Sequence, residues 1–269
     1  ACRGTAGFAH VSCLAEQAKI LVAEALENKW DNARFNPRWI RWSTCSLCKQ
    51  DHHGVVACAL GWACWKTYLG RPEESAFRLT AMRQLGTGLH FAKDYAAALS
   101  VKEAELSTLR RIGGTEDDIL ITLANLAGTY DELGRCEDSL RILQDVYSRR
   151  LEVSGEEHVH TISAAINYAL MLIDLERFAE AKSLLRKVIP VAQRVLGASH
   201  DHTLRMKWAY ATALCTDPAA TRDDLREAVM TLEDSDRTGR RVLGGAHPVT
   251  MGIEVNLREA RAALRAREE

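Results

Sequence analysis

The sequence predicts an all-α fold, a right-handed superhelix of antiparallel helix pairs, preceded by a small and irregular N-terminal region. Two observations support the helix pairs. The pattern Gly-x-x-His-x-x-Thr occurs at residues 155–161 and returns 42 residues later at residues 197–203. Between the two copies, apolar residues recur at helical spacing in two segments. A fixed period of this length is typical of stacked helical repeats, in which each repeat buries its apolar face against its neighbours.

The period extends in both directions along the chain. Gly113 lies one period before the copy at residues 155–161, with Glu116 in the place of the histidine. The full pattern appears again at residues 244–250, five residues later than the period requires. We assign the five additional residues to a loop within residues 216–224, because this stretch contains a proline and three aspartates.

These repeats carry a family resemblance. The segment LANLAGTYDELGRCEDSLRIL, together with connectors such as RVLGASHDHT and RVLGGAHPVT, resembles the tetratricopeptide repeats of the kinesin light chain family. The resemblance covers about residues 78–269. It implies an array of about four repeats, with a last helix over residues 248–266 as its cap. It also implies a protein–protein interaction scaffold whose groove binds a peptide or protein partner.

One recurring position is the candidate for contact with that partner. Asn125, Asn167 and Asn256 each lie nine residues after the histidine position of a connector, and Ala209 takes the same place in one repeat. In kinesin light chain repeats this asparagine faces the concave groove, and the resemblance implies the same position here. An amide suits contact with a peptide backbone because it both donates and accepts hydrogen bonds. The alternative is that these amides only bond neighbouring helices.

The N-terminal region carries a second resemblance. Six of the eight cysteines lie before residue 65, and CRGTAGFAHVSCL followed by CSLC resembles a RING-CH-type zinc finger. The resemblance implies an N-terminally truncated finger over about residues 1–54, with an inserted helix and zinc as cofactor. The tryptophan that helps this family contact a ubiquitin-conjugating enzyme is replaced by Gln17. The implied zinc ligands are Cys2, His10, Cys13, Cys45 and Cys48.

Two alternatives concern the residues around these ligands. Cys45, Cys48, Cys58 and Cys64 could instead form a MYND-like finger. We favour a nearly all-apolar helix over residues 55–69, within a linking segment of residues 55–77, in which Cys58, Trp62 and Trp65 pack. Between the inserted helix and Cys45, residues 29–44 are expected to be irregular or to form a lid. For Cys2 and Cys13, the alternative to zinc ligation is that they are small buried residues, which is common for free cysteine.

Composition narrows the classes of partner. A net charge of −1 favours neither nucleic acid nor an anionic membrane surface. No apolar run approaches the roughly 20 residues that span a bilayer, and a cytoplasmic protein is expected. The pairs His158/His160 and His200/His202 could be metal ligands, but their place before a helix favours a role at the helix start. No phosphate-binding loop, nucleophile elbow or acid–base pair appears, so no catalytic residue is predicted.

The leading functional hypothesis is therefore an interaction scaffold joined to a zinc-binding finger. The alternative is a RING-type ubiquitin ligase, in which the finger recruits a ubiquitin-conjugating enzyme and the repeats select the substrate. A kinesin cargo adaptor ranks lower, because the chain lacks the heptad coiled coil that would attach it to a motor. One local prediction concerns Pro190, which should kink or split the helix that contains it.

Overall fold

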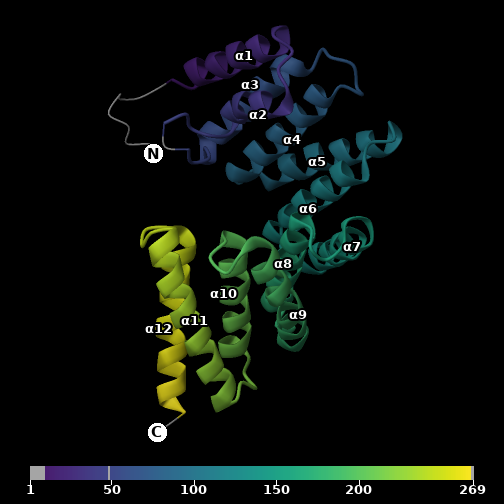
Figure 1. Cartoon of the computed structure of the whole chain (residues 1–269). Helices are drawn as coiled ribbons and strands as arrows, with labels where there is room; N and C mark the ends of the chain where they lie inside the picture. The colour runs from purple at the N-terminus through teal and green to yellow at the C-terminus, as the bar shows by residue number, and fades with distance from the viewer. Residues whose placement is uncertain (1–9, 48, 268–269) are drawn as a thin grey trace. The chain divides into compact units, whose positions relative to one another are not determined.

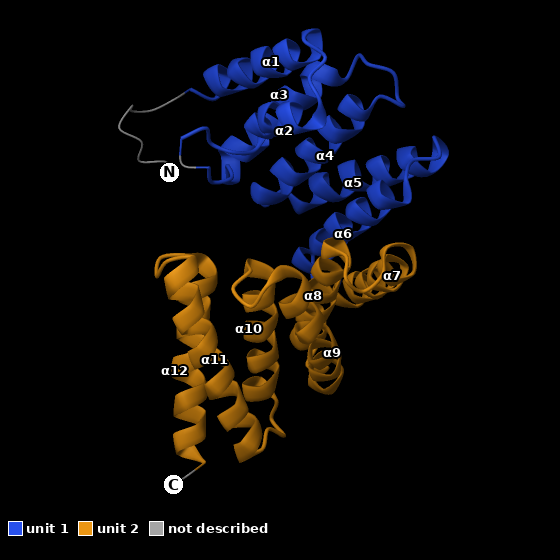
Figure 2. Cartoon of the chain, viewed as in Figure 1, with its two compact units in different colours: residues 1–135 blue, residues 136–269 orange. Residues whose placement is uncertain are grey.

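The computed structural model describes residues 10–47 and 49–267, and in them the fold is all-α, as predicted. The chain divides into two compact units, residues 1–135 and residues 136–269 (Figure 2). Within the described ranges, none of the helices combines the length and the apolar character that crossing a bilayer requires.

In its described residues, the first unit contains six α-helices and one 3-10 turn, and Figure 1 labels the helices α1 to α6. Helix α3 packs against both α1 and α4, and α4 then pairs with α5 and α5 with α6. The helices are α1 (Val11–Glu27), α2 (Asn32–Trp39), α3 (Gly54–Tyr68), α4 (Ala76–Phe91), α5 (Tyr95–Arg111) and α6 (Glu116–Glu132), and the 3-10 turn is Ile40–Trp42.

The segment of residues 29–44 was expected to be irregular or to form a lid. Its central part is not irregular, because it forms α2 and the 3-10 turn. Asp31 caps α2 by accepting a hydrogen bond from the backbone N–H of Arg34 at 3.0 Å. The following turn buries Trp42 completely. Apolar side chains from α1, α3 and α4 surround this indole, including Val22, Leu60 and Ala81. This core therefore joins residues on both sides of position 54, and burial of tryptophan organises the segment that local propensity left undefined.

Helices α3 and α4 approach each other closely because glycines lie at their contact. A Cβ atom at Gly88 would come within 2.6 Å of the carbonyl oxygen of Ala57. A Cβ atom at Gly61 would come within 3.0 Å of the carbonyl oxygen of Gln84. On the same helix α3, Cys58 packs against an apolar cluster of α4 and α5, as predicted, whereas Trp62 is 41% exposed and does not.

The second unit consists of helices that pair in sequence order. Helix α10 lies against α8, α9, α11 and α12, so it forms the centre of the unit. Its core includes Leu204, Met206 and Leu214, all fully buried. The last helix has the bounds that the sequence predicted. The helices are α7 (Cys136–Ser154), α8 (Val159–Asp174), α9 (Phe178–Leu196), α10 (Asp201–Thr216), α11 (Arg222–Val242) and α12 (Pro248–Ala266).

The connectors show why their pattern recurs. Gly197 has φ of +94°, a conformation that side chains disfavour, and it ends α9. His200 then begins α10, and its Nδ1 accepts a hydrogen bond from the backbone N–H of His202 at 3.2 Å. Thr203, fully buried, donates back to the carbonyl oxygen of Gly197 at 2.9 Å. The histidines at the equivalent helix starts of α8 and α12 cap in the same way, which confirms the helix-start interpretation.

Pro190 was predicted to kink or split its helix, and a split is wrong, because α9 runs without interruption from Phe178 to Leu196. Pro190 lies on the exposed face of the helix. The carbonyl group of Arg186, which loses its partner there, belongs to an exposed residue that water can reach. Val188 and Ala192 on the opposite face are buried, so core packing holds the helix together across the missing hydrogen bond.

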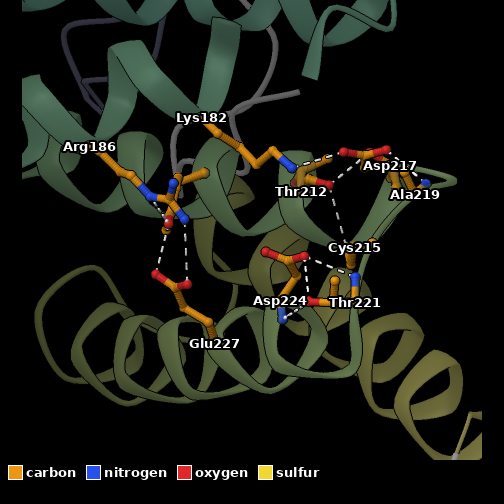
Figure 3. A network of polar contacts seen from close by, with 12 residues as sticks. Lys182, Arg186, Thr212, Cys215, Asp217, Ala219, Thr221, Asp224 and Glu227 are labelled. Atoms are coloured by element: carbon orange, nitrogen blue, oxygen red, sulfur yellow. Dashed lines mark hydrogen bonds and ion pairs between the residues drawn. The ribbon is translucent and has the colours of Figure 1, made fainter. Parts of the chain in front are cut away.

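The five additional residues lie in the loop between α10 and α11, which is held by hydrogen bonds and an ion pair. Figure 3 shows Lys182 of α9 donating to Asp217 at 2.8 Å. Asp217 also accepts from the backbone N–H of Ala219 at 2.9 Å. Thr221 and Asp224 then cap α11 reciprocally, each side chain bonding the backbone N–H of the other. The insertion is thus accommodated without loss of the helix pairing on either side.

Candidate functional site

The repeated asparagine position lies on the first helix of each helix pair, namely α6, α8, α10 and α12. Within the second unit, α10 lies against both α8 and α12, so these three first helices are direct neighbours. Their common layer carries Asn167, Ala209 and Asn256. Asn125 occupies the same repeat position on α6 of the first unit.

Asn125 and Asn167 share one property. Both side chains are half-buried, and neither amide has a hydrogen-bond partner among the described residues. Asn125 is held through its backbone instead, because its main-chain carbonyl oxygen accepts a hydrogen bond from Nζ of Lys102 at 2.8 Å. A half-buried amide without a partner is suited to bond an incoming polar group, because its own hydrogen-bonding capacity is unused.

The asparagine of the last repeat differs from Asn125 and Asn167, because its amide has a hydrogen-bond partner. The amide nitrogen of Asn256 on α12 donates to Oγ1 of Thr212 on α10 at 3.2 Å. Ala209, the residue in the same place on α10, is 3% exposed. Close to this bond the ring of Trp208 covers Gly252, which lies one helical turn before Asn256. Part of the hydrogen-bonding capacity of Asn256 is therefore used between helices.

A buried polar network lies beneath Asn125 in the first unit. The carboxylate of Glu105, 1% exposed, accepts from Arg83 at 2.8 Å and from Thr122 at 3.0 Å. Burial raises the pKa of Glu105, and the Arg83 guanidinium acts against this shift. Arg83 also reaches Asp118 at 3.1 Å. The network joins α4, α5 and α6 through charges that are satisfied by one another.

Lys102 is a buried cation next to the network of Arg83 and Glu105. It is 4% exposed, and its ammonium group donates to Oγ1 of Thr129 at 2.6 Å. Burial lowers the pKa of Lys102 to about 8, and the charge of Glu105 offsets part of this. His90 faces the same hydroxyl group, and burial followed by the charge of Lys102 lowers its pKa. Sequence reasoning missed this network, and its only signal was a lysine and a glutamate on the inner face of a helix.

The predicted zinc ligands are only partly described. Cys2 and Cys48 lie outside the described residues. His10 is the N-cap residue of α1, and Cys13 lies exposed in the first turn of that helix. Cys45 is half-buried, and its backbone N–H donates to the carbonyl oxygen of Gln50 at 2.9 Å. In the ranges that the structure covers, no three potential ligands come together in a metal-binding group.

The MYND-like alternative relies on Cys58 and Cys64. Cys64 is fully buried, packed near Ala18 and Trp42, and burial raises the pKa of its thiol. The surroundings of Cys64 are those of a thiol that packs in an apolar core. The structure also agrees with the packing role that the sequence favoured for Cys58.

Comparison with known protein families identifies two segments of the chain as tetratricopeptide repeats. Residues 77–152 and residues 161–202 match two tetratricopeptide repeat family models. No curated protein sequence matches the chain.

Solved structures show the same fold class. A crystal structure of nearly identical TPR-like repeats from Podosopora anserina, named there as a kinesin light chain, is 16% identical. It aligns over 88% of this chain and 99% of its own, with a TM-score of 0.55. BtubC (BKLC) from P. vanneervenii is 13% identical over 97% of this chain and 93% of its own, with a TM-score of 0.51. The chain thus contains tetratricopeptide repeats, in an all-α fold similar to that of kinesin light chain-like repeat structures.

Proposed function

We propose that the chain is a protein–protein interaction scaffold whose first helices bind an extended peptide segment of a partner. The observation that carries this proposal is the pair Asn125 and Asn167. Both occupy the same repeat position, both are half-buried, and both amides lack a partner among the described residues. A carboxamide can donate to a peptide carbonyl group and accept from a peptide N–H, so each of these amides can recognise peptide backbone rather than sequence.

The test begins with peptides selected from an unbiased phage-displayed library on the purified chain. Their dissociation constants are then measured by fluorescence anisotropy. Replacing both Asn125 and Asn167 with alanine should weaken binding by about 1–3 kcal/mol, the cost of unmade hydrogen bonds. The melting temperature should not change, because neither amide bonds another described residue.

A matched control is Asn28→Ala, since the Asn28 amide donates only to Glu24 of its own helix at 2.8 Å. This variant should bind the selected peptides as the wild type does. Unchanged affinity in the double variant would contradict the proposal. So would a large drop in its melting temperature, because the two amides would then support the fold.

A finer proposal concerns the N-terminal region. We propose that residues 1–54 bind zinc through Cys2, His10, Cys13, Cys45 and Cys48, in a finger of the kind that recruits a ubiquitin-conjugating enzyme. Its support is the resemblance of the sequence and the turn around Cys45, where Thr44 and Asp51 form an antiparallel bridge. Structural zinc requires four ligands. Cys2, Cys45 and Cys48 would form one site, and His10 and Cys13 the other, so the chain should hold at most one zinc ion.

Elemental analysis of the purified chain tests this. Cys45→Ala should remove the bound zinc, whereas Cys58→Ala should retain it. Two tightly bound ions per chain would show that the ligand assignment is wrong. Metal content that is unchanged by Cys45→Ala would remove the zinc-finger proposal.

A further inference from the structure

An aromatic pocket lies in the first unit, and none of the repeated asparagines lines it. Its volume is about 610 Å³, which falls in the range of sites for small organic ligands. Its walls come from the end of α1, the connection to α2, the inner face of α2 and the start of α4. The aromatic side chains that line it are Trp30, Phe35, Trp39 and Phe77.

Aromatic contacts join α2 to α3 and α4 in the wall of the pocket. Phe35 and Trp39 reach the ring of Phe77 with centroid separations of 5.7 Å and 5.9 Å. Trp39 also meets Tyr68 of α3 at 5.3 Å. These rings pack edge-on or tilted against one another, which is their preferred arrangement, so the wall is held by its own contacts.

The rim of the pocket is cationic. Lys29 is the only charged residue that lines it within the described chain, and no lining residue is acidic. Lys29 is held there by the chain reversal that ends α1, in which it adopts φ of +49°. Next to it the Arg38 guanidinium stacks over the ring of Trp30 at 4.4 Å. Asn36 and Thr80 add neutral hydrogen-bonding groups to the lining.

From this combination we propose that the pocket binds a carboxylate attached to a flat aromatic body. The aromatic walls accept the ring, and Lys29 attracts the carboxylate, an arrangement that would disfavour a cation. Two sources have this chemistry: a free aryl-substituted carboxylic acid, and the C-terminal residue of a peptide that ends in phenylalanine or tryptophan. The site is separate from the proposed peptide-binding amides on α6 and α8.

Isothermal titration calorimetry with 4-biphenylacetate and its primary amide tests the proposal. The acid should bind with one-to-one stoichiometry and at least about tenfold more tightly than the amide. Lys29→Gln should abolish this preference for the acid. Lys93→Gln is the matched control, since Lys93 is likewise exposed and has φ of +65°, but does not line the pocket. It should bind both compounds as the wild type does.

A second variant tests the pocket without removal of an aromatic wall. Ala76 is exposed at the start of α4 and lines the pocket, so Ala76→Trp should fill it and abolish binding while the circular dichroism spectrum stays unchanged. Absence of saturable binding to the wild type would overturn the proposal. Equal affinity for acid and amide, or undiminished binding in a folded Ala76→Trp variant, would do the same.

Two further ligands separate the sources. A pentapeptide ending in phenylalanine with a free carboxylate should bind, and its amidated form should not, if the natural ligand is a peptide terminus. Binding of 4-biphenylacetate alone would assign the pocket to a free small acid. The Asn125→Ala/Asn167→Ala variant should bind 4-biphenylacetate normally, so failure of the scaffold proposal and failure of this one are distinguishable.

Discussion

The indole ring of Trp208 lies against Gly252 so closely that a Cβ atom at position 252 would come within 2.3 Å of it. The two residues belong to α10 and α12, neighbouring first helices of the second unit. Glycine at this position is therefore a packing requirement, although it weakens the helix that contains it.

Gly252→Ala should lower the free energy of unfolding by about 1–3 kcal/mol, because the added methyl group must displace the Trp208 ring. Urea denaturation followed by circular dichroism measures this. The control is Gly128→Ala in α6, where a Cβ atom would meet nothing within 4 Å. That change should stabilise by about 0.5–1 kcal/mol through helix propensity. A Gly252→Ala variant as stable as the Gly128→Ala variant would contradict the packing argument.

Buried Lys102 should make stability depend on alkaline pH. Its folded-state pKa of about 8 lies below the ordinary value of 10.5. Below pH 8 the folded and unfolded states are both protonated, and the folded state bears the cost of burying the charge. As the pH rises from 8 towards 10.5, the folded state releases its proton first, so the free energy of unfolding should increase by about 1–3 kcal/mol.

The measurement is the difference in unfolding free energy between the wild type and Lys102→Met at pH 7, 8, 9 and 10. This difference removes the effects of other groups that titrate in the same window, such as Tyr68, whose pKa is raised by burial. The wild type should gain relative to Lys102→Met as the pH rises. Lys66→Met, at an exposed lysine, should follow the wild type. A constant difference across this range would show that Lys102 keeps its proton.

The capping histidines should stabilise the helix starts independently of core packing. His200→Ala removes the acceptor for the backbone N–H of His202 and should cost about 0.5–2 kcal/mol. His200→Asp supplies another good capping side chain and should restore most of that loss. The melting temperatures of both variants, measured by thermal unfolding, show whether the cap accounts for the loss of stability. Equal losses in the two would mean that the imidazole ring, not the cap, is what stabilises this helix start.

The inserted loop should depend on Lys182. Its ion pair with Asp217 is shielded, with each side chain 16% exposed. Lys182→Met should release this anchor and speed tryptic cleavage after Arg222, at the start of α11. Lys187→Met on the exposed face of the same helix α9 should leave the cleavage rate unchanged. Equal rates in the two variants would indicate that the capping of α11 alone holds the loop.

Much of the repeat architecture could be read directly from the chain. The Gly-x-x-His-x-x-Thr pattern specifies a helix end, a helix start and a buried threonine within seven residues, all by local backbone chemistry. The helix near residues 55–69 was predicted from a nearly all-apolar run, and the last helix at residues 248–266 from the resemblance to known repeats. These features depend on residues close in sequence, so the sequence determined them without knowledge of distant partners.

Other features were decided by tertiary packing. Helix α2 and its turn are held by burial of Trp42 among residues of α1, α3 and α4, distant contacts that no local pattern encodes. Helix α9 continues through Pro190 because buried neighbours on the opposite face stabilise it more than one lost hydrogen bond destabilises it. Equivalent positions also diverged: Asn167 lacks a partner among the described residues, whereas Asn256 bonds Thr212. Sequence repetition determines which helix face a residue occupies, but its hydrogen bonds depend on which side chain the neighbouring helix supplies.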